Sequence, residues 1–102
     1  MKILLVCASG MSTSLIVEKM KKSLTADEQD SVIVAVPEEE FERIVKDYDV
    51  VLLGPQIRYK KASFEKIATE LGRPLDVINT VDYGMARGDK ILEHARKLLA
   101  KK

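Results

Sequence analysis

Cys7 is the residue most suited to chemistry, since it is the only cysteine and directly follows the apolar run 3–6. The loop after it consists of small and polar residues, Ala8, Ser9, Gly10, Met11, Ser12, Thr13 and Ser14. Small side chains leave backbone N–H groups accessible, and such a loop before a helix is a good phosphate-binding site. The same positive field favours a thiolate, so we expect Cys7 to attack a phosphoryl group whose oxygens the loop holds.

Each of these features also has a purely structural interpretation. A cysteine at the end of a buried strand is often a packing residue, and a loop rich in serine and threonine can simply cap the next helix. The cysteine alone would favour packing. The cysteine followed by seven small or polar loop residues favours a functional site.

The loop also separates two kinds of cysteine chemistry. Phosphatases of this architecture have an arginine six residues after the cysteine, which grips phosphate with two hydrogen bonds. Thr13 occupies that position, and the loop contains neither arginine nor histidine. The sequence therefore favours a phosphoryl carrier over a cysteine-based low-molecular-weight phosphatase or arsenate reductase, which stays open as an alternative.

A flavin-binding module is the second alternative. Flavodoxin-like domains bind flavin phosphate with loops of this composition, and Tyr59 and Tyr83 are candidates to enclose the ring. Only 5% of the residues are aromatic, which weighs against this interpretation.

Alternating apolar patterns predict the elements that position the loop. Short runs of β-branched and aliphatic residues predict strands, and apolar residues at helical spacing predict helices. The expected strands are 3–6, 32–36, 50–53 and 75–78, and the expected helices begin at Ser12 and Pro37 and cover 62–71 and 91–99. The stripes expected to be buried are Leu15, Ile16, Met20 and Leu24 in the first helix and Phe64, Ile67, Ala68 and Leu71 in the third, while 79–87 is expected to be a loop.

This order of elements predicts an α/β fold with one domain over residues 1–102. Four β-α units imply a parallel sheet with helices on both faces, here of the flavodoxin-like three-layer type with strand order 2-1-3-4. Ligands of such sheets bind at the carboxyl ends of the strands, where the chain changes direction. We therefore expect the loops at Cys7 and Gly54 to flank one site.

Several other residues are weaker site candidates. Gln56 lies in the loop after the third strand, and Arg58, Tyr59 and Tyr83 are candidates for its rim. Together with Met11, Lys60 and Lys61, they would form a surface for partners. The only histidine, His94, falls inside the last helix, away from any anion-binding loop, and is interpreted as structural or solvent-facing.

Composition narrows the classes of partner. The chain has 17 basic and 16 acidic residues, a net charge of +1, which gives no reason to expect nucleic acid as a partner. No apolar run approaches the length of a membrane span or a signal peptide, so we expect a cytosolic protein without direct membrane insertion. We expect neither a metal nor another cofactor.

Two stretches carry a resemblance to a known family. Cys7–Leu15 and Leu52–Ile57, with Tyr83-Gly84 in support, resemble the IIB component of the phosphoenolpyruvate-dependent sugar phosphotransferase system, lactose/cellobiose/chitobiose class. The resemblance covers essentially the whole chain. It implies that Cys7 accepts a phosphoryl group from a phosphohistidine on a IIA protein, that residues 8–14 bind it, and that a sugar bound by the membrane protein IIC receives it. Such a IIB component associates with the membrane transiently, through IIC, which selects the sugar.

Overall fold

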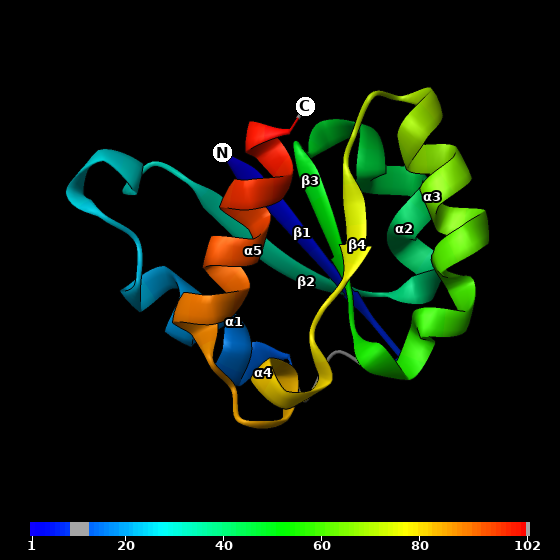
Figure 1. Ribbon diagram of the computed structural model, residues 1–102. Helices are drawn as coiled ribbons and strands as arrows, with labels where there is room; N and C mark the ends of the chain where they lie inside the picture. The colour runs from blue at the N-terminus through cyan, green and yellow to red at the C-terminus, as the bar shows by residue number, and fades with distance from the viewer. Residues whose placement is uncertain (9–12, 102) are drawn as a thin grey trace.

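The computed structural model describes residues 1–8 and 13–101. Four strands alternate with helices, as the sequence predicted (Figure 1). The elements in chain order are β1 (Lys2–Cys7), α1 (Ser14–Lys22), η1 (Ala26–Glu28), β2 (Val32–Pro37), η2 (Glu38–Glu40), α2 (Phe41–Ile44), η3 (Val45–Asp47), β3 (Val50–Leu53), η4 (Pro55–Lys60), α3 (Lys61–Glu70), β4 (Leu75–Val77), α4 (Thr80–Gly84) and α5 (Gly88–Ala100), where η denotes a 3₁₀-helix.

The sheet has four parallel strands in the order β2-β1-β3-β4, which confirms the predicted topology. β1 lies in the middle, and its Leu4 pairs in register with Val34 of β2 and Val51 of β3. Residues 3–6 of β1 are therefore paired on both sides, whereas Lys2 and Cys7 have register partners in β2 alone. The three carboxyl ends of these strands meet at one edge of the sheet.

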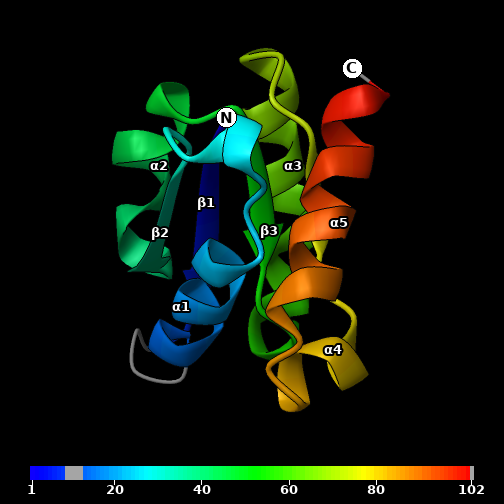
Figure 2. The same ribbon diagram turned by 90° about the vertical axis from the view of Figure 1, so that its left-hand side faces the viewer.

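Side chains alternate across the sheet and form two cores. Ile3 and Leu5 face the side covered by α1 and α5, while Leu4 and Val6 face α2 and α3. Figures 1 and 2 show these two helical layers on opposite faces of the sheet. Because both faces are covered, β1 is a continuous apolar run in the sequence rather than an alternating one.

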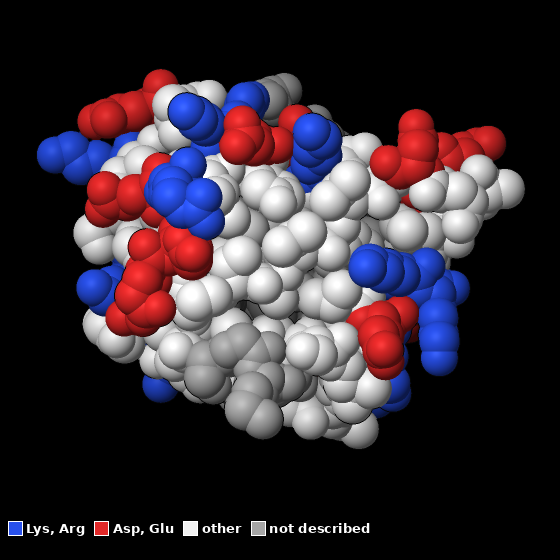
Figure 3. All heavy atoms as spheres, turned by 180° about the vertical axis from the view of Figure 1, so that it is seen from behind, with Lys and Arg blue, Asp and Glu red and all other residues white. Residues whose placement is uncertain are grey.

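From behind, the charged side chains on the molecular surface lie mostly around the border of a broad uncharged area (Figure 3).

Two expected elements differ from the structure. The helix expected after Pro37 is divided into η2, α2 and η3, and its fully buried side chains are Phe41 and Val45. The loop expected over 79–87 contains the short helix α4. Asn79 caps it by accepting hydrogen bonds from the N–H groups of Val81 (2.9 Å) and Asp82 (3.1 Å).

The expected buried stripes are correct in part, and Leu24 and Ile67 are only partly buried. Ile16, Met20, Phe64 and Ala68 are buried, but Leu15 and Leu71 are exposed. Ile16 and Met20 are four residues apart and define the inward line of α1, which turns Leu15 outward. Leu71 is the C-cap residue of α3 and lies past its last turn.

Two contacts fix α5 to the rest of the chain. Gly88 at its start packs directly on the backbone of Lys19 and Met20 in α1. Near its other end, Arg96 donates to both carboxylate oxygens of Glu28, at 2.6 and 2.9 Å. The hydrogen bonds from Arg96 hold the pKa of Glu28 at about 2, well below its usual range.

We expect Gly88→Ala to destabilise the protein by about 1–3 kcal/mol, because a Cβ there would overlap the backbone of α1. Gly84→Ala is the matched control, since a Cβ there meets no neighbouring atom within 4 Å. Urea unfolding of the two variants and the wild type measures the difference. Equal unfolding midpoints for both variants would show that α1 and α5 do not depend on this close approach.

The ion pair of Glu28 with Arg96 predicts acid sensitivity with a definite sign. The folded-state pKa is about 2 against an ordinary value of 4.5, so the stabilisation is complete above about pH 4.5 and is lost as the pH falls towards 2. We expect Glu28→Gln to lower the unfolding midpoint at pH 7 and to approach the wild type near pH 2. A gap that does not depend on pH would contradict the ion pair.

Candidate functional site

The carboxyl ends of β1, β2 and β3 bring three loops together around Cys7. Cys7 is the last residue of β1 and lies in register with Pro37 at the end of β2. On the other side, Val6 pairs with Leu53, and the N–H group of Gly54 donates to the carbonyl of Val6 at 2.8 Å. The predicted placement of Cys7 and Gly54 at one edge of the sheet is therefore confirmed.

Among the described residues, Val36 of β2 and Thr13, the N-cap residue of α1, contact the Cys7 side chain. Its Sγ lies 3.3 Å from the hydroxyl oxygen of Thr13 and 3.7 Å from the carbonyl oxygen of Val36. Only 1% of Cys7 is exposed, so its side chain is buried. Its position as the last residue of a central strand explains this burial.

The predicted phosphate-binding loop is described in part. Ala8 is an exposed bend, Thr13 is fully buried, and Ser14 begins α1. Ser9, Gly10, Met11 and Ser12 lie outside the described residues. The amide cradle expected for 8–14 therefore stays a prediction, and Thr13 is the loop residue whose side chain the structure places at the sulfur.

Gly54 lies between Gln56 and Cys7 and leaves no room for a side chain of its own. A Cβ on Gly54 would come within 2.7 Å of Gln56 Oε1 and 3.7 Å of Cys7 Cβ. The side-chain amide of Gln56 therefore occupies the space that a side chain at position 54 would take, and Cys7 borders the same space. The sequence analysis treated Gly54 only as the residue that ends a strand. The order Gly54-Pro55-Gln56 was the one feature of the sequence that could have indicated the close approach of Gln56 to Gly54.

The other rim candidates have different surroundings. Arg58 and Tyr59 are exposed on η4, whereas the Lys61 ammonium lies 3.4 Å from a carboxylate oxygen of Asp76 in β4. Lys60 lies over the rings of Tyr59 and Phe64, about 6 Å from each centroid. Tyr83 is partly buried against the core under α1 and α5, which agrees with a packing role.

Exposed apolar residues of this edge were missed by sequence reasoning. Leu15, Val81 and Met85 are 53%, 62% and 58% exposed. Figures 1 and 2 show α4 and the start of α1 at the same end of the molecule, where β1 and β3 also end. Val81 lies in α4, and Met85 is the C-cap residue of that helix. Their exposure was not predicted, because residues 79–87 were expected to form a loop without a helical face.

His94 belongs to a separate cluster beside β4. Its Nε2 lies 2.9 Å from Asp76 Oδ2, and Lys61 lies near the other carboxylate oxygen. Burial raises the pKa of Asp76, but hydrogen bonds from the Val77 N–H, His94 and Lys61 outweigh it, so the pKa lies below its usual range. This placement supports the structural interpretation of His94.

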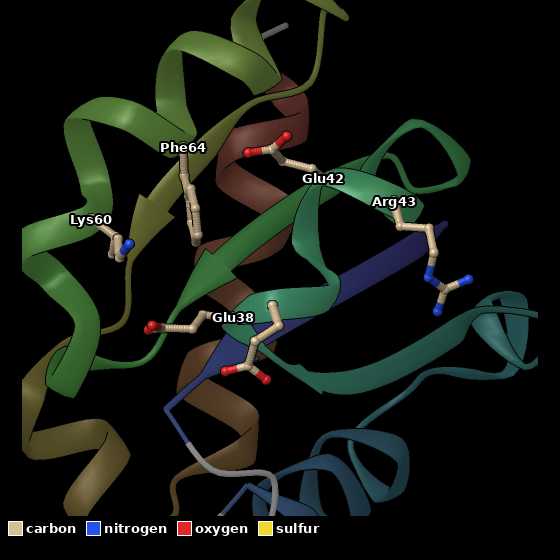
Figure 4. Close-up of a pocket in the computed structure, with 6 residues that line it drawn as sticks. Glu38, Glu42, Arg43, Lys60 and Phe64 are labelled. Carbon is tan, nitrogen blue, oxygen red and sulfur yellow. The ribbon is translucent and has the colours of Figure 1, made fainter.

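A cavity of about 550 Å³ lies between η2–α2 and η4–α3 (Figure 4). Its lining consists of Glu38, Glu39, Glu42, Arg43, Lys60 and Phe64. One carboxylate oxygen of Glu38 is buried there without a hydrogen-bond partner among the described residues. The cavity has charges of both signs and does not include Cys7, so it is distinct from the predicted site.

Two negative findings concern residues 1–8 and 13–101. This part of the chain contains no cluster of three side chains able to hold a metal ion. None of its helices combines the length and the apolar character needed to cross a lipid bilayer.

Comparison with curated proteins gives relatives along nearly the whole chain. Two from Lactococcus lactis, the "PTS system galactose-specific EIIB component" and the "PTS system cellobiose-specific EIIB component", are each 42% identical, with 95% of this chain and 94% of the relative aligned. The "PTS system oligo-beta-mannoside-specific EIIB component" of Bacillus subtilis is 40% identical, covering 96% of this chain and 95% of the relative.

Solved structures agree with the sequence relatives. The cellobiose-specific phosphotransferase IIB component from Borrelia burgdorferi is 40% identical and superposes with a TM-score of 0.81, covering 100% of this chain and 94% of that one. The lactose-specific IIB domain from Streptococcus pneumoniae has a TM-score of 0.83 over 96% of both chains, and at 18% identity it supports the fold alone.

The family assignment follows from these similarities and from a family model. The model "PTS system, Lactose/Cellobiose specific IIB subunit" matches residues 2–94. These findings support the predicted IIB role and neither the flavin module nor the phosphatase or arsenate reductase. The chain belongs to the family of lactose/cellobiose-specific IIB subunits of the sugar phosphotransferase system.

Proposed function

We propose that Cys7 of this chain carries the phosphoryl group of a sugar phosphotransferase system, with residues 1–102 as the carrier domain. The observation that carries the proposal is the position of Cys7 at the end of β1, where Thr13, Val36 and Gly54 surround it. A nucleophile at this edge of a parallel sheet, directly before a helix, lies where such folds bind anions.

Two transfers form the proposed cycle. In the first, the Cys7 thiolate attacks the phosphorus of a phosphohistidine on a IIA protein, so the S–P bond forms and the N–P electron pair returns to histidine. In the second, a hydroxyl of a sugar held by membrane IIC attacks the same phosphorus, its proton passes to a base of IIC, and the S–P electrons return to sulfur. The reaction is that of a protein-phosphocysteine sugar phosphotransferase.

The loop and Gln56 would hold the phosphoryl oxygens during both transfers. Backbone N–H groups and hydroxyls of residues 8–14 are the proposed donors, and Gln56 beside Gly54 is a candidate to orient the group. Thr13 in place of a phosphatase arginine fits a carrier, because rapid hydrolysis would waste the group. We propose that neither a metal nor another cofactor takes part.

The proposed substrate is a β-disaccharide such as cellobiose, chitobiose or lactose. The relative named for cellobiose and the family model named for lactose and cellobiose support this class. We propose that the protein works in the cytoplasm and meets the membrane only transiently, when it docks on IIC. The selection of one sugar then belongs to IIC.

The two partners must reach the same sulfur in turn, so one surface would serve both. We propose that this surface comprises the exposed residues Leu15, Val81, Met85, Arg58 and Tyr59. Tyr83 would anchor α4, because its partly buried side chain packs against the core. Exposed methionine and aliphatic side chains adapt to more than one partner. Arg58 would attract acidic partner surfaces.

We expect one phosphoryl group per chain after incubation with the general phosphotransfer proteins and a matching IIA. Cys7→Ser should fold and gain none, because the serine hydroxyl stays protonated near neutral pH. His94→Gln is the matched control and should be labelled like the wild type. Intact mass measures all three proteins, and full labelling of Cys7→Ser or loss of labelling in His94→Gln would contradict the proposal.

We expect Met85→Asp to raise the IIA concentration needed for half-maximal transfer about tenfold or more, because it places a charge in an apolar contact. Leu71→Asp is the control, since Leu71 is also exposed but lies at the opposite end of the sheet. Initial rates of labelling test both variants. Equal effects of the two substitutions would exclude α4 from the docking surface.

A further inference from the structure

β2 forms one of the two outer edges of the sheet. It is the first strand in the order β2-β1-β3-β4, so only one of its sides has a neighbouring strand. The N–H group of Val32 donates to the carbonyl of Met1 at 2.9 Å and therefore points to the β1 side. Because the backbone groups of successive residues alternate between the two sides of a strand, Ile33 and Ala35 direct their N–H and C=O groups outward.

The outward groups of Ile33 and Ala35 have no partner among residues 1–8 and 13–101. Neither a loop nor a side chain of this part of the chain bonds to them. Pro37, the next outward residue, lacks an N–H group, and proline within sheets is found at such edges. β2 therefore presents two residues with complete pairing groups to its outside.

The side chains along this edge are apolar. β2 contains no charged residue. Val32 is 39% exposed, and Val34, Ala35 and Val36 are half-buried although helices cover both faces of the sheet, so solvent reaches them from the edge. Figure 2 shows β2 on the side of the sheet that faces the viewer of Figure 3, where the broad uncharged area lies.

The opposite edge of the sheet is protected against pairing. β4 has three residues, and the N–H group of its Val77 donates to the carboxylate of Asp76 at 2.8 Å. The same carboxylate lies near Lys61 and His94. Charged side chains are a usual means by which edge strands avoid pairing with another chain. Among the described residues, β2 carries no such protection.

We propose that β2 pairs with β2 of a second copy of this chain, antiparallel and around a two-fold axis, in a reversible dimer. The two four-stranded sheets would then form one continuous sheet. The dimer concerns the assembly of the chain and does not depend on the proposed function.

The outward residues define the register of this pairing. In antiparallel strands, opposite residues exchange both N–H···O bonds where their backbone groups face each other. Ile33 of each copy then lies opposite Ala35 of the other, and Val34 lies opposite Val34 on the axis. Val32 of each copy meets Val36 of the other, and β-branched pairs across strands are favourable. The edge is self-complementary in this register, which favours a second copy as its partner.

The first charged residues beyond β2 limit the strength of the dimer. Asp30 precedes the strand and Glu38 follows it, so the antiparallel arrangement brings acidic residues of the two copies near each other at both ends. Like charges disfavour association, and salt screens them. We therefore expect a dimer that dissociates on dilution and becomes tighter as the ionic strength rises.

The first test is sedimentation equilibrium of the purified chain between about 10 μM and about 1 mM, a range suited to weak association. We expect the wild type to approach twice the mass of one chain at the upper end. Val34→Lys should remain a single chain throughout, because two lysines would meet on the axis. Leu71→Lys is the control and should associate like the wild type, since Leu71 is exposed at the end of α3.

The second test is amide hydrogen exchange of the wild type, which needs no substitution. The amides of Ile33 and Ala35 should exchange at least about tenfold more slowly in the concentrated than in the dilute protein, because the second copy accepts their hydrogen bonds. The amides of Val34 and Val36 point to β1 and should exchange at the same rate in both.

Every outcome decides the proposal. It is overturned if the wild type has the mass of one chain at about 1 mM, or if a folded Val34→Lys associates like the wild type. If thermal unfolding shows that Val34→Lys is not folded, the exchange of Ile33 and Ala35 decides, and rates that do not depend on concentration exclude the dimer. Protection of these two amides only after a IIA protein is added would assign the edge to a different protein and contradict pairing with a second copy.

Discussion

The parallel pairing of β1 with β2 on one side and β3 on the other is the constraint on which the site depends. It brings Cys7 level with Pro37 and places Gly54 against the carbonyl of Val6. Two apolar cores hold β1 from both faces, so the sulfur has a fixed position relative to Val36 and Thr13. The 3.3 Å contact between Cys7 Sγ and the Thr13 hydroxyl oxygen depends on this fixed position of β1.

Burial of the sulfur gives the site its particular chemistry. In water, a thiolate is stabilised by solvent, whereas here the stabilisation has to come from the protein. Among the described residues, the Thr13 hydroxyl lies 3.3 Å from the sulfur, and it carries no full charge. Under the proposed function, such a site would hold and release a phosphoryl group reversibly. It lacks the arginine with which a phosphatase of this architecture would bind the phosphate more strongly.

The sequence predicted those features that depend on local patterns. Strand order, the two covered faces and the position of Cys7 follow from apolar runs such as 3–6 and 50–53 and from the rules for parallel sheets. The depth of Cys7, the closeness of Gln56 to Gly54 and the exposure of Val81 and Met85 depend on how distant elements pack. The cap that Asn79 forms on α4 was readable in the sequence, but the contact of the Thr13 hydroxyl with the Cys7 sulfur was not, because capping is the usual role of a threonine before a helix.

The central claim is that the phosphoryl group is bonded to the sulfur of Cys7, and phosphorus NMR of the labelled protein tests it most directly. The chemical shift distinguishes phosphorus on sulfur from phosphorus on nitrogen or oxygen without any substitution in the protein. The account predicts one resonance, typical of an S–P bond, which disappears when unphosphorylated IIA is added and the group returns to its histidine. A resonance typical of an N–P bond on this chain would place the group on His94 and contradict the account.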